Sequence, residues 1–285
     1  MERDRLYAAL DAYLEALSGQ DEAAVTWASG ARTSENNVML EPGDGLWGTI
    51  DRLGDYRLRF ADASSGEVGF FGTVHEHTEE SGYTVRLRLN PAGEIAEAET
   101  IVVRQSDSGI KFLNQRWYDK PILNADVASP ALRTEMVALA DGYFSTLEKN
   151  DGTIHTVFAE DCNRVENGVQ TTNNPEFAYI VPVAALGCEA QFAMGNYRYD
   201  DRLRGRRFPL VDEQRGLVLA FGFIDHCGRL AEYQLTDGRT VQSPIRYPHS
   251  FYLAELFKID GGVIRQIEAN FITVPYHMKS PWDGC

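Results

Sequence analysis

Two patterns of hydrophobic and polar residues follow one another along the chain: the spacing of an amphipathic helix and the every-second-residue spacing of a strand. The N-terminal segment "MERDRLYAALDAYLEAL" spaces its apolar residues as on one face of an amphipathic helix. A second helical stripe, Val137, Ala140, Phe144 and Leu147, opens the other half of the chain. Each helical stretch is followed by several long segments that alternate apolar and polar residues with period two, as strands do. The pattern predicts an α+β protein whose curved sheets wrap on helices.

The chain also repeats itself. Residues 10–35 and 140–166 share the order helix, polar turn, second helix, strand. The strand segments "GEVGFFGTVHEH" and "GLVLAFGFIDHC" match, as do "GEIAEAETIVVR" and "GGVIRQIEANFITVP". An internal repeat of this length predicts two domains of the same kind.

The two domains are expected to join near "KPILNADVASPALR", where two prolines and polar residues interrupt the periodicity. We therefore divide the chain into residues 1–124 and residues 125–285. The second domain carries an insertion at about 169–209 that is rich in Asn, Tyr and Arg. Insertions of this length are often functional lids or interface segments.

Composition narrows the choice of partners. The chain has 42 acidic and 27 basic residues and a net charge of −15, so nucleic acid and anionic membranes are unfavourable partners. A neutral or cationic small molecule is easier to accommodate. Apolar runs are too short to span a membrane, and the N-terminus lacks a signal-peptide core, so we expect a cytoplasmic protein unless a leader has been removed.

The four cysteines are Cys162, Cys188, Cys227 and Cys285, and none has CxxC or Cys/His metal spacing. We expect reduced thiols in a cytoplasmic chain, with Cys162 and Cys188 the candidate pair in a secreted one. His75 and His77 lie two apart but have no identifiable third ligand. We therefore expect no metal and no cofactor.

The segment "FAEDCNRVENG" places Arg164 and Glu166 two residues apart at the start of a predicted strand. Side chains two residues apart in a strand point to the same face of the sheet, so Arg164 and Glu166 would both contact whatever that face covers. An exposed ion pair of no functional meaning would show the same spacing. In the first half, Arg32 lies three before Glu35, which puts the two on opposite faces of a regular strand. We therefore favour the second domain as the active one and the first as a scaffold or degenerate copy.

The helical hairpin, the phrase "FAEDCNRVE" and the terminal run of strands together resemble the NTF2-like superfamily, which includes SnoaL-like cyclases and ketosteroid isomerases. The resemblance covers nearly the whole chain and implies two tandem cone-shaped α+β domains, each a curved, mostly antiparallel sheet around two or three helices. The phrases "LGCEAQF", "RRFPLVDEQRGLVLAFGFIDH" and "VPYHMKSPW" also resemble an uncharacterised NTF2-like family of fungi and some bacteria.

The isomerase resemblance implies roles for particular residues. A pocket tyrosine on the first helix of the fold matches Tyr143, and Tyr13 in the other half. The carboxylate general base on the first strand matches Glu166, and Glu35 in the other half. The spacing of Tyr143 fits an ordinary core tyrosine equally well.

The second acid of the family falls at or beside Ala254. The nearest carboxylate, Glu255, is one residue out of register, so it would need a β-bulge to reach the pocket. A regular strand puts Glu255 on one face with His249 and Phe251, which is what an acid–base pocket needs. We therefore add His249 to the catalytic candidates.

Other candidates are weaker. A histidine at a strand end, such as His226, is more often a surface residue. Asn167 follows the Arg164 and Glu166 pair directly, and Tyr247 precedes the strand of His249. The predicted substrate-binding set is Asn167, Phe251, Glu255, Tyr247 and His226.

Together these features predict a cofactor-independent lyase that acts on a hydroxylated aromatic small molecule, such as a lignin-derived dimer, by carboxylate, Tyr and His acid–base chemistry. The prediction rests on similarity to scytalone-type dehydratases and to bacterial cofactorless diarylpropane lyases that release formaldehyde. The alternative is a noncatalytic small-molecule-binding or assembly module. An isomerase or an epoxide hydrolase remains a further alternative, and sheet faces could pair the chain in a homo-oligomer.

Overall fold

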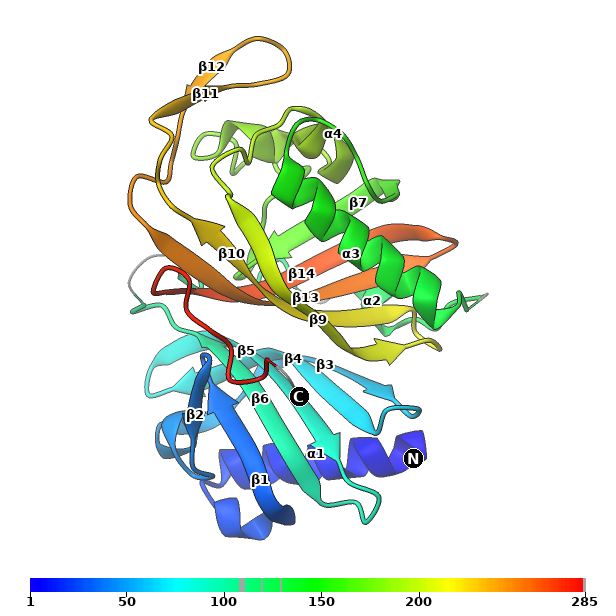
Figure 1. Cartoon of the computed structure of the whole chain (residues 1–285). Helices are drawn as coiled ribbons and strands as arrows, with labels where there is room; N and C mark the ends of the chain where they lie inside the picture. The colour runs from blue at the N-terminus through cyan, green and yellow to red at the C-terminus, as the bar shows by residue number, and fades with distance from the viewer. Residues whose placement is uncertain (108–110, 119, 129, 284–285) are drawn as a thin grey trace.

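The computed structural model describes residues 1–107, 111–118, 120–128 and 130–283 (Figure 1). In the first domain, α1 (Arg3–Ser18) lies along one face of a six-stranded sheet of order β2-β1-β6-β5-β4-β3. The short helices η1 (Glu22–Ala24) and η2 (Gly45–Gly48) flank the first two strands. The strands are β1 (Trp27–Glu35), β2 (Val38–Leu40), β3 (Ile50–Asp62), β4 (Glu67–Glu76), β5 (Glu79–Leu89) and β6 (Ile95–Val103).

The second domain repeats this arrangement with the sheet order β8-β7-β14-β13-β10-β9. Its long helix is α3 (Arg133–Lys149), preceded by α2 (Pro121–Asn124) and followed by η3 (Pro182–Ala185) and α4 (Cys188–Ala193). The strands of this sheet are β7 (Phe158–Glu166), β8 (Val169–Gln170), β9 (Arg202–Asp212), β10 (Leu217–His226), β13 (His249–Asp260) and β14 (Val263–Val274). A separate two-stranded hairpin, β11 (Glu232–Gln234) and β12 (Thr240–Gln242), projects from the body of the domain (Figure 1).

Each sheet has one parallel pair, β1 with β6 and β7 with β14, and the other neighbours are antiparallel. The same strand order on the same kind of helix confirms the predicted fold class, two tandem cone-shaped α+β domains with mostly antiparallel sheets. Part of the predicted insertion is regular structure. Residues 202–209 belong to β9, which takes the place that β3 has in the first sheet.

Each cone has its own core on the concave face of its sheet. In the first domain, Leu6, Leu10 and Leu17 of α1 pack on inward residues of the strands. In the second, α3 buries Met136, Ala140 and Phe144. The helix ends at Lys149, and its C-cap residue Asn150 has a left-handed φ of 40° and donates its backbone N–H to the Thr146 carbonyl. Of the stripe that the sequence shows, Ala140, Phe144 and Leu147 are buried and Val137 is partly buried against them, and Met136 joins them.

The two sheets pack against each other through their convex faces (Figure 1), which form a third apolar cluster. Glu99 of the first sheet crosses this interface to Arg207, with 2.5 Å between Oε1 and Nη2, and accepts a hydrogen bond from the Tyr252 hydroxyl. The Tyr56 hydroxyl donates to Glu268 at 2.6 Å. The cluster includes Leu58, Phe71 and Ile101 from one sheet and Leu219, Phe221 and Ile272 from the other.

The segment after β14 runs back onto the first domain. The indole N–H of Trp282 donates to Ser34 Oγ at 3.0 Å, and Arg32 lies over the same indole ring. The C-terminal tail therefore ties the two domains together, in addition to their sheet interface. Within the described ranges, no helix is both long enough and apolar enough to cross a membrane.

Candidate functional site

Side chains alternate between the two faces of β7. Arg164 and Glu166 lie on the concave face of the second sheet, and Val165 between them packs in the cluster between the sheets. Arg164 Nε lies 3.4 Å from Glu166 Oε2. The Arg164 side chain is 2% exposed and the Glu166 side chain is 27% exposed. The predicted same-face pair therefore forms, with the cation buried and the carboxylate partly exposed.

Residues of the insertion hold the Arg164 guanidinium in place. Its Nη2 donates to Gln191 Oε1 at 2.8 Å and to the Tyr197 hydroxyl at 2.5 Å. The cation also lies over the rings of Phe192 and Tyr197, 5.5 and 5.3 Å from their centroids. A buried guanidinium with this many partners has a fixed orientation, which fixes the position of its Glu166 partner.

Glu255 lies behind this pair. Its carboxyl group hydrogen-bonds the Tyr143 hydroxyl, and both side chains are buried. Burial and then the negative charge of Glu166 raise the pKa of Glu255 to about 8, although Tyr143 and Arg164 act in the opposite direction. At neutral pH, Glu255 therefore keeps its proton while it sits beside the Arg164 and Glu166 ion pair. Burial also raises the pKa of Tyr143 well above its ordinary value.

The expectation that Glu255 needs a β-bulge to reach the interior is wrong. The pairing of β13 with β10 and β14 is continuous from Ser250 to Lys258. Ala254 points to the cluster between the two sheets, and Leu253 points to the concave core. Glu255 shares that concave face without any irregularity, so the position inferred for the second acid at Ala254 was the one on the wrong face.

The expectation of a surface position for His226 is also wrong. His226 is buried, and its Nε2 lies 2.9 Å from Asp200 Oδ1 in the insertion. Asp200 is buried as well, and burial raises the pKa of its carboxyl group. The insertion covers the strand end and so removes His226 from solvent.

His249 stacks on His226, with 4.8 Å between ring centroids, and its ring lies 5.2 Å from that of Phe251. Its Nδ1 lies 2.9 Å from the Tyr247 carbonyl oxygen, so Nδ1 carries a proton and Nε2 is left as an acceptor in the neutral ring. Burial lowers the pKa of His249, which favours this neutral form. His249 is only half-buried and remains accessible.

The structure does not bring Asn167 and Tyr247 into this arrangement. The side-chain amide of Asn167 pairs with the backbone N–H and C=O of Phe271, at 2.9 Å each, so it braces two strands. The Tyr247 side chain is 80% exposed. A substrate-binding role for either residue stays a prediction.

The accessible part of the concave face is a strip of partly exposed side chains from three strands: Glu166, His249, Phe251, Phe271 and Thr273. The rings of Phe251 and Phe271 lie 5.1 Å apart between the carboxylate and the imidazole. Buried polar side chains lie behind both ends of the strip, Tyr143 and Glu255 behind Glu166 and His226 and Asp200 behind His249. The arrangement offers two aromatic rings, tilted at 45° to each other, with a proton acceptor at either side.

The sequence reasoning missed the residues that the insertion contributes, Gln191, Tyr197 and Asp200. The available signal was its content of Tyr and Asn, which indicated a functional segment without indicating which side chains turn inward.

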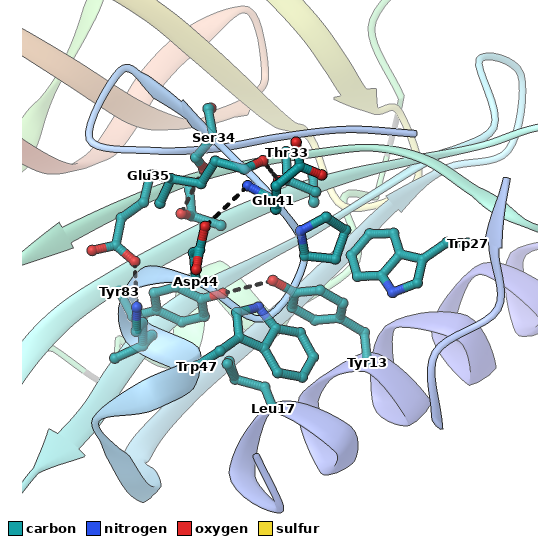
Figure 2. A pocket seen from close by; sticks show the side chains of 15 residues that line it. Tyr13, Leu17, Trp27, Thr33, Ser34, Glu35, Glu41, Asp44, Trp47 and Tyr83 are labelled. Atoms are coloured by element: carbon teal, nitrogen blue, oxygen red, sulfur yellow. Dashed lines mark hydrogen bonds between the residues drawn. The ribbon is translucent and has the colours of Figure 1, made fainter. Parts of the chain in front are cut away.

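The first domain places its own pair, Tyr13 and Glu35, around a small cavity of about 20 Å³ (Figure 2). The Tyr13 and Tyr83 hydroxyl oxygens lie 3.4 Å apart. Glu35 accepts a hydrogen bond from the Leu46 backbone N–H at 2.7 Å and one from Arg104 at 3.1 Å. Both carboxylate oxygens of Glu35 therefore already accept a hydrogen bond. A scaffold role for the first domain stays a prediction.

No cluster of three or more His, Cys, Asp or Glu side chains that could hold a metal ion occurs among the residues that the structure describes. Cys162, Cys188 and Cys227 are free thiols, and Cys188 Sγ lies 3.2 Å from the Cys162 carbonyl oxygen. Cys285 lies outside the described residues.

Residues 130–271 match a family model described as a domain of unknown function, DUF8021. No curated protein matches the chain.

Solved structures with similarity to the chain share little sequence with it. AusH from Aspergillus nidulans is 14% identical, with a TM-score of 0.31, over 38% of this chain and 89% of that one. An NTF2-like protein of unknown function from Cytophaga hutchinsonii is 10% identical, with a TM-score of 0.28, over 50% of this chain and 100% of that one. A de novo designed protein with a curved β-sheet is 15% identical, with a TM-score of 0.31, over 36% and 88%.

Proposed function

We propose that the second domain is a cofactor-independent lyase in which Glu166 accepts a proton from a hydroxylated aromatic molecule. The observation that carries the proposal is the pairing of a partly exposed Glu166 carboxylate with a buried Arg164 cation whose Nη2 donates to Gln191 and Tyr197. The pair lies at one end of an aromatic strip formed by Phe251 and Phe271. A substrate ring that packs on this strip brings its hydroxyl groups toward Glu166 or His249.

The elimination we propose uses one base. Glu166 takes the proton of a terminal hydroxyl group, and the O–H electron pair forms the carbonyl group of formaldehyde as the adjacent C–C bond breaks. The C–C electron pair forms an alkene and expels a hydroxyl group from the next carbon. That hydroxyl leaves as water with the proton returned from Glu166, so protons and electrons balance.

Glu255 and Tyr143 act in this scheme as positioning residues, because both are buried behind the strip. The charge of Glu166 contributes to the raised pKa of Glu255. Glu255 therefore senses the charge of Glu166, which changes when Glu166 accepts the substrate proton. His249 supplies a neutral imidazole that can accept a hydrogen bond from a second substrate hydroxyl.

The alternative is a noncatalytic binding domain, which the burial of Tyr143 and Glu255 favours. The test uses a phenolic 1,2-diarylpropane-1,3-diol, with formaldehyde and alkene formation followed together and binding followed by calorimetry. We expect equal amounts of the two products from the wild-type chain. Binding without products supports the binding domain, and an alkene shift without formaldehyde supports an isomerase.

A further inference from the structure

Two buried cysteines of the second domain lie together beside Arg164. Cys162 is on β7 and Cys188 is the first residue of α4, and the two residues are 1% and 2% exposed. Cys188 Sγ lies 3.2 Å from the Cys162 carbonyl oxygen, and the two thiols hydrogen-bond each other. The fold therefore brings two sulfur atoms together from positions 26 residues apart in the sequence.

The same strand and helix make a second contact next to this one. Cys162 and Arg164 are two residues apart on β7 and share its concave face. Cys188 and Gln191 are three residues apart on α4 and share one side of that helix. Arg164 Nη2 donates to Gln191 Oε1 at 2.8 Å, so the cysteine contact and the Arg164 hydrogen bond are adjacent. A covalent bond between the cysteines would therefore hold Gln191 against Arg164.

We propose that Cys162 and Cys188 form an oxidisable pair, which a peroxide converts into a disulfide that fastens α4 to β7. The Cys188 thiolate attacks one peroxide oxygen and becomes a sulfenic acid, and the hydroxide that leaves takes up the proton lost by Cys188. The Cys162 sulfur then attacks the Cys188 sulfur, and the sulfenic hydroxyl leaves as water with the Cys162 proton. The two thiols lose two electrons and two protons, and the peroxide is reduced to two molecules of water.

The surroundings of the two sulfurs make Cys188 the one that reacts first. The hydrogen bond from Cys162 lowers the pKa of Cys188 against the effect of its burial, and the positive charge of Arg164 lowers it further. The same hydrogen bond, together with burial, raises the pKa of Cys162. A peroxide oxidises the thiolate form, so Cys188 is the nucleophile and Cys162 supplies the second sulfur.

The alternative is that both cysteines are inert core residues, as buried free cysteines often are. Cys227 helps to separate the two cases, because it is partly exposed and has different contacts. Its Sγ lies 3.2 Å from Asp201 Oδ1 and 2.7 Å from Arg229 Nε. Oxidation that follows exposure alone should therefore modify Cys227 and spare the buried pair.

The test is treatment of the full chain with hydrogen peroxide, followed by alkylation of the remaining thiols, digestion and mass spectrometry. We expect a linked pair of peptides that contain Cys162 and Cys188 and have lost two hydrogen atoms. Chymotrypsin gives a second readout, because Tyr179 lies between the two cysteines in the sequence and is 84% exposed. After cleavage at Tyr179, the fragments on its two sides should stay joined on a denaturing gel until a reductant separates them.

Two variants complete the test. Cys188→Ser should abolish the linked peptides, and the matched control Cys227→Ser should leave their yield unchanged. In the Cys227→Ser chain, peroxide should raise the urea concentration at the midpoint of unfolding, and a reductant should reverse the change, because the bridge closes a loop in the unfolded chain.

Three outcomes would overturn the proposal. Cys162 and Cys188 could both remain alkylatable at peroxide concentrations that oxidise Cys227, or the linked peptides could join a different pair of cysteines. The oxidised Cys227→Ser chain could also prove less stable than the reduced one, which would show that the two sulfurs are wrongly placed for a bridge. The lyase proposal for Glu166 is independent of all three outcomes.

Discussion

Arg164 Nε and Glu166 Oε2 lie 3.4 Å apart on the concave face of the second sheet, with the guanidinium buried and the carboxylate partly exposed. This asymmetry separates the pair from an ordinary surface ion pair, in which both ends face water. Arg164 is held by Gln191 and Tyr197, so the position of Glu166 is set by the interior of the domain.

The first prediction concerns the stability that Arg164 provides. Arg164→Leu leaves Gln191 Oε1 and Glu166 without their cationic partner, so we expect the free energy of unfolding to fall by about 3 kcal/mol. Urea unfolding measures it. Arg116→Leu is the matched control, because Arg116 pairs with Glu176 at the surface, and it should cost less than about 1 kcal/mol. Equal costs for the two variants would show that Arg164 is not an interior anchor.

The second prediction concerns pH. A glutamate with an ordinary pKa of 4.5 when unfolded has a pKa of about 8 at Glu255 in the folded chain, so the folded state binds the proton more tightly. The stability from this proton is fully present below about pH 4.5 and is lost as pH rises toward 8. Glu255→Gln keeps a neutral group there and should remove this loss. Its stability relative to wild type should rise by at least about 1.4 kcal/mol between pH 5 and pH 8. A pH-independent difference would mean that Glu255 titrates normally.

The third prediction isolates the hydrogen bond between Tyr143 and Glu255. Tyr143→Phe removes a donor from a buried carboxyl group, so the chain should lose about 1 to 2 kcal/mol of stability. The same change should raise the pKa of Glu255 further, because this hydrogen bond lowers it. Unfolding at pH 6, together with the pH profile described above, measures both effects. Tyr247→Phe, at an exposed ring, is the control and should change neither.

The fourth prediction concerns the interface between the domains. Residues 125–285 expressed alone would expose the convex face that carries Leu219, Phe221 and Ile272. A contiguous apolar face of this kind drives association in water, so we expect the isolated domain to dimerise or precipitate. Analytical ultracentrifugation distinguishes the outcomes. A stable, soluble monomer would show that the interface contributes little to the fold.

The fold and the β7 pair could be predicted from the sequence because both depend on periodicity. Alternation in a strand fixes which side chains share a face, so Arg164 and Glu166 were found together. The error at Glu255 has the same origin, since an alignment that is one residue off selects the opposite face. Ala254 was placed where Glu255 lies.

The partners of Arg164 and His226 could not be predicted in this way. Gln191, Tyr197 and Asp200 come from an irregular segment whose path depends on tertiary contacts rather than on a repeating pattern. His226 looked like a surface residue because nothing in its own strand indicates the cover that the insertion provides. The residues that line the small cavity of the first domain likewise lie far apart in the sequence.

The measurement that tests the central claim most directly is formaldehyde release from the phenolic diarylpropanediol by Glu166→Gln. Glu160→Gln, at an exposed carboxylate on the same strand, is the matched control. We predict that Glu166→Gln lowers the turnover number by about 10²- to 10⁴-fold while substrate still binds, and that Glu160→Gln leaves turnover unchanged. Turnover by Glu166→Gln within a few-fold of wild type would contradict the assignment of Glu166 as the base.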